Sequence, residues 1–277
     1  GKKLAEIEKF AGFDRKLATA LRKEQAAIVD VSTVALHNRQ IYRFGTIPGA
    51  WWETRDAKSN DGERNAVRML NGDYKHDASE IIWSLPNGLH GFALADGAGN
   101  RVDAAPDFIA SDGRAPGADR RVHAGLSCVR CHVEGIRPID CWARRAYAAP
   151  DKLEVADPVR FLRLRQLYLS NLNRPIERDQ GDYAAAILEA NGLGVGDNAK
   201  VVAGVWYRYV EELVTLDDLA REKDCKPEEL VAAIRAKGSQ EVVDPILLAL
   251  GKAKPLALRR EYVEEMWPVL MGVLRDK

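Results

Sequence analysis

Cys128, Cys131 and His132 form the pattern C-x-x-C-H, whose residue types and spacing fit one particular chemistry. Two cysteines three positions apart lie on one helical turn, where each thiol can add to a vinyl group of a haem. The histidine next to the second cysteine then lies under the porphyrin and binds the iron. The pattern therefore predicts one covalently attached haem c, held by Cys128 and Cys131, with His132 as the proximal iron ligand.

Two other uses of this cysteine pair fit the sequence less well. A structural zinc site needs a second pair at similar spacing, whereas Cys141 and Cys225 stand alone. A thioredoxin-like redox pair follows a strand, whereas this pair follows a loop rich in Gly, Asp and Arg. For Cys141 and Cys225 the sequence leaves two possibilities open, a disulfide or two free and buried thiols.

The composition limits the partners that the chain can bind. The 277 residues are 46% apolar, so the chain can bury a sizeable core, and 41 Lys and Arg balance 41 Asp and Glu. This balance predicts no nucleic-acid partner, because no global field attracts a polyanion. No stretch approaches the roughly 20 apolar residues of a membrane span, and we therefore expect no integral membrane segment.

The haem motif also predicts where the protein works. Haem c is attached outside the bacterial cytoplasm, so we expect a periplasmic or otherwise exported protein of the bacterial envelope. Residues 1–17 lack the apolar centre of a signal peptide. The sequence is therefore interpreted as a mature chain whose leader has been removed.

Before the haem motif, the pattern indicates a small antiparallel meander. Residues 79–85 and 89–96 are short, apolar and aromatic, and the dipeptide Asn87-Gly88 between them supplies the positive φ values of a tight hairpin turn. Arg101 and Val102 can begin a third strand. Upstream, residues 3–28 show near-helical spacing of apolar side chains, and residues 41–60 indicate extended chain and loop.

After about residue 150 the pattern becomes helical. Asp157-Pro158 is typical of a helix start, and further helices are expected at 179–191, 198–213, 215–223, 227–237, 241–250 and 256–275. The sequence therefore predicts a mainly α fold with a small antiparallel β-hairpin or meander before the haem site, a non-classical c-type cytochrome. We expect residues 1–150 to form the haem c-binding part and residues 151–277 an all-helical part packed against it.

Two strings in the sequence carry a resemblance to a known family. HDASEIIWSLPNGLHGFALADGAGNRVDAAP at 76–106, followed by AGLSCVRCHVEG at 124–135, resembles a family of little-characterised bacterial envelope proteins with one c-type haem. HNRQIYRF at 37–44, GAWWETRDA at 49–57 and the tail with TLDDLAREKDCKPEELVAAI are also similar to it. The resemblance implies covalent haem and an exported location. His90 departs from the pattern, which has glutamine there.

The face of the iron opposite His132 determines whether the haem transfers electrons or binds ligands. Its candidate ligands are His37, His76, His90, His123, Met69, Met266 and Met271. The resemblance implies His76, and the neighbouring Asp77 can orient its imidazole ring, so we predict His76 as the second iron ligand. A ligand from His90, a methionine or an open position filled by water remain alternatives.

Arginines gather around the haem motif, at Arg120, Arg121, Arg130, Arg137, Arg144 and Arg145. A guanidinium group can bind a haem propionate through two hydrogen bonds. We expect Arg130 and Arg137 to belong to the haem site. The alternative for each is a solvated face balanced by nearby acidic residues.

These features predict an exported c-type cytochrome that transfers single electrons between redox partner proteins. The alternatives are a haem c enzyme, with peroxidase or small-molecule ligand chemistry at an open iron position, and a haem-based sensor or scaffold. A single C-x-x-C-H motif makes a two-haem peroxidase the weaker form of the enzyme hypothesis.

Overall fold

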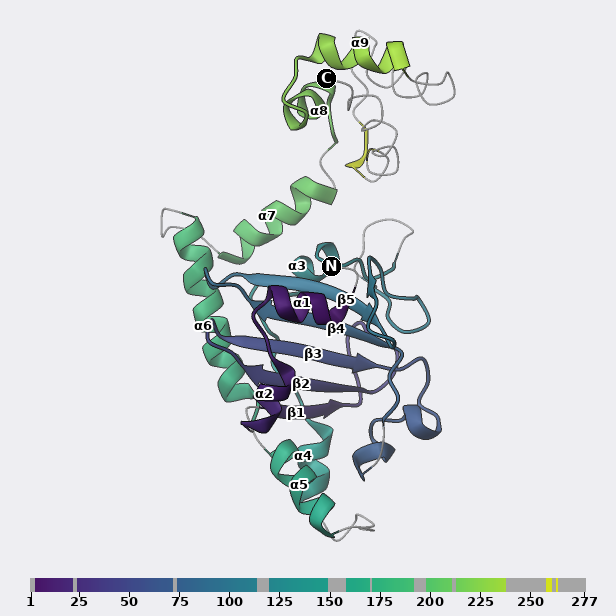
Figure 1. The fold of residues 1–277 in the computed structure, drawn as a ribbon, viewed down its shortest axis with the longest axis vertical. Helices are drawn as coiled ribbons and strands as arrows, with labels where there is room; N and C mark the ends of the chain where they lie inside the picture. Colours follow the sequence, from purple (N-terminus) through teal and green to yellow (C-terminus); the bar gives the residue numbers. More distant parts are fainter. Residues whose placement is uncertain are drawn as a thin grey trace. The chain divides into compact units, whose positions relative to one another are not determined.

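The computed structural model describes residues 3–21, 24–71, 74–113, 120–148, 158–169, 171–191, 198–210, 213–237, 258–260 and 263. A six-stranded antiparallel sheet forms its centre, and its strands lie side by side in chain order (Figure 1). The strands are β1 (Glu24–Val29), β2 (Arg39–Gly45), β3 (Ala50–Asp56), β4 (Ala78–Ser84), β5 (His90–Asp96) and β6 (Arg101–Val102).

This sheet shows that the expected fold class, mainly α with a small hairpin, is wrong. The helical spacing over 3–28 ends early, because residues 24–29 form β1. Ala26, Ala27 and Ile28 in β1 are fully buried, with apolar neighbours on both faces of the strand. A strand covered on both faces has consecutive apolar residues, and this pattern cannot be told from that of a buried helix.

The expected hairpin is present as β4 and β5, with β6 as the short strand after it. Gly88 in its turn has a φ of +81°, in the region that favours glycine. Trp83 lies opposite Gly91 across the pair. A Cβ atom added at Gly91 would lie 2.3 Å from the Trp83 ring, so the indole fills the space that a side chain at position 91 would need.

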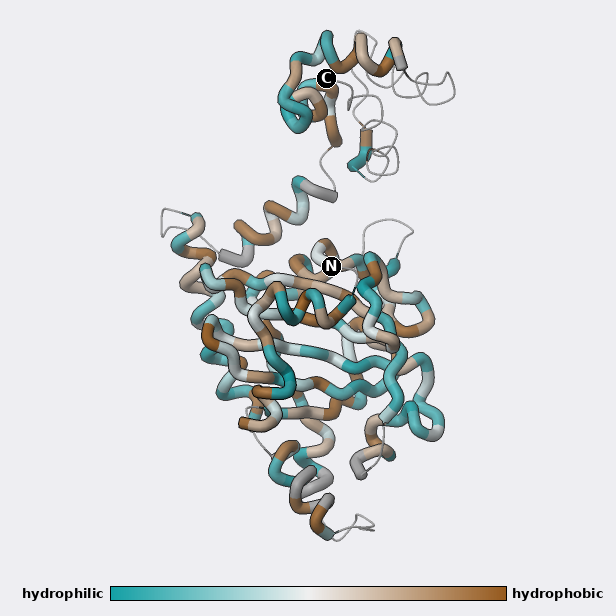
Figure 2. Tube along the Cα trace, in the orientation of Figure 1, coloured by the Kyte–Doolittle hydropathy of each residue, from teal (hydrophilic) through white to brown (hydrophobic). Residues whose placement is uncertain are grey.

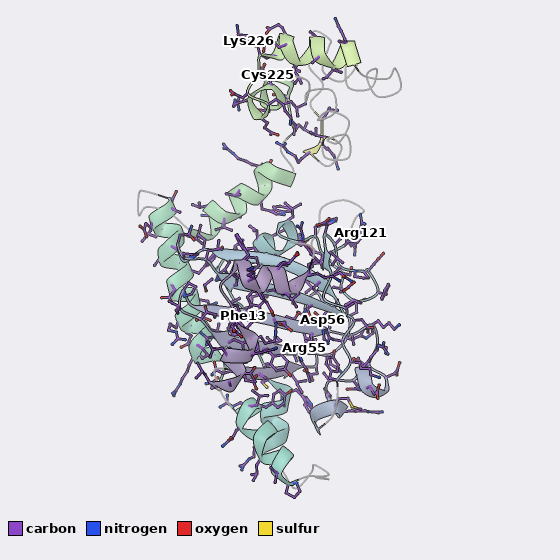
Figure 3. All side chains as sticks on the ribbon, viewed as in Figure 1. Phe13, Arg55, Asp56, Arg121, Cys225 and Lys226 are labelled. Atoms are coloured by element: carbon purple, nitrogen blue, oxygen red, sulfur yellow. The ribbon has the colours of Figure 1, made fainter. Side chains whose placement is uncertain are left out.

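One face of the sheet carries an apolar core beneath two short helices, α1 (Leu4–Phe10) and α2 (Arg15–Ala20), which lie in front of the sheet in Figure 1. Phe13 lies over the sheet (Figure 3), and its ring stacks on Trp51 with ring centroids 4.7 Å apart. The buried members of this core are Ile7, Phe13, Ala18, Phe44, Trp51, Ile81, Trp83, Ala93 and Ala95. We call this the apolar face.

The opposite face mixes apolar and charged side chains, and we call it the polar face. Figure 2 shows hydrophilic as well as hydrophobic stretches within the sheet. On this face Arg43 in β2 forms a two-pronged ion pair with Asp179, with N–O distances of 2.8 and 2.9 Å. The Trp52 indole N–H also donates to Asp179, over 3.0 Å. These contacts hold helix α6 (Asn173–Ala190) against the sheet.

Three further helices belong to the same part of the chain: α3 (Leu126–Cys131), α4 (Trp142–Ala148) and α5 (Pro158–Leu169). Both α4 and α5 contact β1. Tyr168 in α5 is buried with Ala26 and Ile28, so α5 covers the β1 edge of the sheet.

The contacts within the chain divide it into two compact units, residues 1–202 and 203–277. Helix α7 (Asn198–Val210) crosses this division. In the second unit, α8 (Leu216–Glu222) and α9 (Pro227–Lys237) pack around Leu219, Leu230 and Ile234. The division expected near residue 150 stays a prediction.

The helices expected at 179–191, 198–213, 215–223 and 227–237 correspond to α6 to α9, but α6 begins at Asn173, six residues earlier than expected, and residues 211–212 lie outside the described residues. The expected helix at 241–250 and nearly all of the one at 256–275 lie outside the described residues. Within the described ranges, we find no helix with the length and apolar character needed to cross a lipid bilayer.

Candidate functional site

The two cysteines of the haem motif lie on α3, one helical turn apart, and His132 is the residue that ends this helix. The helix begins after Gly125, whose φ of +78° allows the chain to turn sharply into it. Cys128 is buried, with 1% of its surface exposed, and Cys131 is half-buried. Both are free thiols, as are Cys141 and Cys225.

The imidazole ring of His132 is held by a hydrogen bond to the main chain. Its Nδ1 lies 3.0 Å from the carbonyl oxygen of Gly135. Because a carbonyl oxygen only accepts hydrogen bonds, Nδ1 must donate and therefore carries the ring proton. The lone pair of the neutral ring is then on Nε2, the tautomer that many metal-binding histidines adopt.

All three motif residues line one cavity, which has a volume of about 540 Å³. This volume falls within the range of roughly 300–1,000 Å³ that is usual for cofactor and ligand sites. The sheet supplies one wall through Ile41, Trp52 and Ile82 of the polar face, and the segments 29–34 and 136–140 supply much of the rest. Apolar walls, two thiols and an imidazole are the set of groups that a covalent haem requires.

A buried charged network lies in the sheet wall of this cavity. Arg39 in β2 donates to both carboxylate oxygens of Asp56 in β3, over 2.6 and 2.7 Å, and to Thr54 Oγ1 over 3.1 Å. The Glu80 carboxylate lies 3.7 Å from the same guanidinium group. Burial opposes the charge of Arg39, but the carboxylates of Asp56 and Glu80 outweigh burial and raise its pKa. Arg39 therefore stays a fixed cation beside the cavity.

Glu80 in β4 brings a carboxylate next to the haem motif. Its Oε1 atom lies 3.8 Å from Nε2 of His132, and its negative charge acts on the nearby Cys128 thiol. Burial and the Glu80 carboxylate together raise the pKa of the Cys128 thiol well above its ordinary value. The thiol is therefore protonated at neutral pH, and it carries the hydrogen that addition to a vinyl group requires.

The structure separates the two arginines expected at the haem site. Arg137 lines the cavity and donates to Thr33 Oγ1 over 3.2 Å. Arg130 forms an ion pair with the buried Asp112 and is not among the cavity-lining residues that the structure describes. Arg145 also lines the cavity, where it pairs with Asp140. Arg39, Arg137 and Arg145 are thus the arginines among the described residues that line the cavity.

The histidines predicted as second iron ligands do not line the cavity in the part of the chain that the structure describes. His76 lies in the segment before β4, where burial and the charge of Arg55 lower its pKa. His90 stacks on Tyr183 of α6, with ring centroids 4.1 Å apart. The structure does not bring His76 together with His132, and its assignment stays a prediction.

The remaining candidates for the second iron ligand either are not among the described cavity-lining residues or lie outside the described residues. His37, His123 and Met69 are partly buried but are not among the described cavity-lining residues. Met266 and Met271 lie outside the described residues. Over the described ranges, we find no cluster of three or more His, Cys, Asp or Glu side chains arranged to hold a bare metal ion.

Arg39 and Glu80 are among the residues of the cavity wall that the sequence analysis did not identify. The alternation of side chains along β4 could have placed Glu80 at the cavity, because Glu80 and Ile82 share one face of the strand while Ile81 and Trp83 share the other. Since Ile82 is apolar and Glu80 is charged, this face does not show the regular hydrophobic alternation by which a half-buried strand is recognised.

No protein-family model, curated protein or solved structure matches the chain.

Proposed function

We propose that this protein carries one haem c, bound covalently in the cavity lined by Cys128, Cys131 and His132. The observation that supports it is the shared cavity: both thiols and the imidazole reach one space of about 540 Å³. Attachment needs no oxidant, because each S–H bond adds across a vinyl C=C bond, sulfur bonds to one carbon and the hydrogen goes to the other. His132 is ready to bind the iron, because its proton is held on Nδ1 by Gly135.

The proposed place of work is the periplasm or another exported location in the bacterial envelope. This proposal depends on the haem itself, because haem c attachment takes place outside the bacterial cytoplasm, and on the family resemblance of the segments 76–106 and 124–135. The proposed partners are redox proteins, and the balance of charges gives no support to a nucleic-acid partner.

The proposed activity is one-electron transfer between these partners. A bound haem supplies reversible one-electron chemistry at iron. The chain's own contribution is to exclude water and to hold the cofactor rigidly: Trp52, Ile82 and Ile136 form apolar walls, and Arg39 is fixed by Asp56. A rigid, partly dry site changes little between oxidation states, which favours rapid electron transfer.

Ligand chemistry or sensing at the iron is the second candidate, and one observation favours it. Among the described residues that line the cavity, His132 is the sole imidazole and no methionine occurs. The two strongest partners for a low-spin haem iron are therefore not supplied on the opposite face by these residues. A small molecule could then bind there, and Glu80, which lies 3.8 Å from Nε2 of His132, could act on it as an acid or base.

Production in a bacterial periplasm with a haem c attachment system tests the first proposal. We expect a haem-stained band on a denaturing gel and haem that stays with the polypeptide in acidic acetone. Extractable haem, or none, would contradict covalent attachment. Carbon monoxide then separates the two activities, because a saturated ferrous iron resists it and an open one binds it.

A further inference from the structure

We propose that the Glu80 carboxylate is the ligand of the ferric haem iron on the face opposite His132. This inference rests on the proposed function and assigns the position that the described histidines and methionines leave without a ligand. Glu80 and the residues that contact it all lie within the first unit of the chain.

Glu80 and His132 lie at the separation that two ligands of one metal ion require. Oε1 of Glu80 lies 3.8 Å from Nε2 of His132. A first-row metal ion bonds imidazole nitrogen and carboxylate oxygen at about 2.0–2.2 Å each, so two such ligands on opposite sides of one ion lie roughly 4 Å apart. The pair has nearly the separation needed when a single iron lies between them.

The second step is the way in which the strand presents this side chain. The β3–β4 pairing keeps one register from Trp51 to Asp56, but the pairs Thr54–Glu80 and Arg55–Ser79 are missing from it. The backbone N–H of Glu80 donates instead to the side-chain oxygen of Thr54, over 3.0 Å. The register is the same on both sides of this gap, so the alternation of side chains along β4 keeps Glu80 on the polar face with Ile82, where both line the cavity.

The third step is that Glu80 has weak partners within the described structure. Its side chain is 13% exposed, and burying a carboxylate is costly unless an opposite charge or a metal compensates. Arg39 lies 3.7 Å away, beyond hydrogen-bond distance, because Asp56 already holds that guanidinium group with two bonds. Glu80 therefore keeps a lone pair available for a further partner.

The fourth step follows from haem attachment. The Glu80 carboxylate lies close enough to the Cys128 thiol to act on it electrostatically. When the S–H bond adds across the vinyl group, sulfur becomes a thioether and has no hydrogen left to donate. The sulfur thus cannot serve as a partner of the carboxylate once the cofactor is attached, which leaves the iron held by His132.

A carboxylate is a hard, anionic ligand, so it stabilises ferric over ferrous iron. The ferric protein should therefore be high-spin, and reduction should weaken the bond to Glu80. The Glu80→Gln variant keeps the size of the side chain and removes its charge. We expect this variant to shift the midpoint potential to more positive values and to change the ferric absorption and magnetic circular dichroism spectra.

Glu53→Gln is the matched control. Glu53 is also a buried strand glutamate, but it lies on the apolar face, where it pairs with Arg15 and Arg55. We expect its variant to lose stability and to keep the wild-type haem spectrum and potential. If Glu80→Gln and Glu53→Gln both leave the spectrum and potential unchanged, Glu80 is a structural ion-pair partner and the proposal is wrong.

Two measurements keep the proposal testable if Glu80→Gln does not fold. Near-infrared magnetic circular dichroism of the unmodified ferric protein identifies its axial ligands, and bands of a bis-histidine or histidine–methionine haem would overturn the Glu80 assignment. A spectrum that changes in His76→Ala would overturn it in favour of His76. Covalent haem content, measured by mass, reports separately on the proposed function, which fails if the wild-type chain carries no haem.

Discussion

The two faces of the sheet are built from the same strands, but one is closely packed and the other borders a cavity. Trp51 and Ile81 point into the apolar face and are completely buried, whereas Trp52 and Glu80 point into the polar face and line the cavity. The apolar face is filled by side chains from α1 and α2, while the polar face keeps an open volume surrounded by ion pairs. One sheet thus forms a packed core on one side and the wall of a cavity on the other.

Charged side chains are tolerated inside the polar face because they are buried as pairs. Arg39 and Asp56, like Arg43 and Asp179, are buried as pairs with two hydrogen bonds each. Paired in this way, charges compensate one another's loss of water, although they add less stability than good apolar packing. The polar face therefore gives up some stability to gain fixed charges around the cavity.

The largest expected effect is on the cavity itself. Replacing Cys128 and Cys131 together by alanine should abolish covalent haem completely, because no thiol then remains to add to either vinyl group. Mass spectrometry of the purified chain measures the loss. Cys225→Ala in the second unit is the control, and we expect full haem content there. A double variant that still carries haem through acid would show that another residue attaches it.

The next largest effect is on the polar face's link to α6. Asp179→Ala leaves Arg43 buried without its partner, and we expect a loss of about 3–5 kcal/mol in the free energy of unfolding. Urea denaturation measures it. The double variant Arg43→Met with Asp179→Leu should recover most of this loss, because no unpaired charge remains. Asp103→Ala, which removes an exposed ion pair with Arg101, should cost less than about 1 kcal/mol.

A pH effect is expected from His90, also on the polar face. Burial and the nearby His132 lower the pKa of His90 from 6.5 to about 4. Its Nδ1 is buried without a hydrogen-bond partner in the described structure. The unfolded chain therefore takes up a proton at a higher pH than the folded chain, so stability is full above pH 6.5 and falls between pH 6.5 and 4.

Comparison with His90→Phe isolates this effect, because the ring can keep its stacking on Tyr183. Between pH 7 and pH 5, the wild type should lose about 2 kcal/mol more than the variant. Urea denaturation at the two pH values measures this difference. Equal losses in both proteins would show that His90 is protonated as readily in the folded chain as in the unfolded one.

The smallest expected effect is a difference in stability between variants of two neighbouring residues, Ile81 and Ile82. Ile81→Val on the apolar face should cost about 0.5–1.5 kcal/mol, the usual result for a buried methyl group. Ile82→Val should cost less, because Ile82 already borders the cavity. The haem absorption spectrum should change in Ile82→Val alone. A larger stability loss at Ile82 would mean that the two faces do not differ as described.

The parts of the fold that follow local rules are predictable from the sequence. Asn87-Gly88 identifies the β4–β5 turn, and Thr215 and Pro227 identify the starts of α8 and α9. The wider sheet is not predictable in this way. Its strands β2 and β3 carry the buried charges Arg39, Arg43 and Asp56, which look exposed until their partners are known, and those partners lie on other elements.

The candidate site divides along the same line. Cys128, Cys131 and His132 are adjacent in the chain, so covalent chemistry fixes their spacing and the motif identifies them directly. Glu80 and Arg39 reach the same cavity from different strands, far from the motif in sequence. Their place depends on strand register, which a single sequence specifies only weakly when one face of the sheet is polar.

Gly91 has a consequence for how reliably this molecule reaches one arrangement. The Trp83 indole needs a residue without a Cβ atom opposite it, and Gly91 meets this need in β5. If β5 slipped by one residue, His90 or Phe92 would collide with the indole, and the side chains of β5 would exchange faces. The absence of a side chain at position 91 thus favours one alignment of β5 against β4.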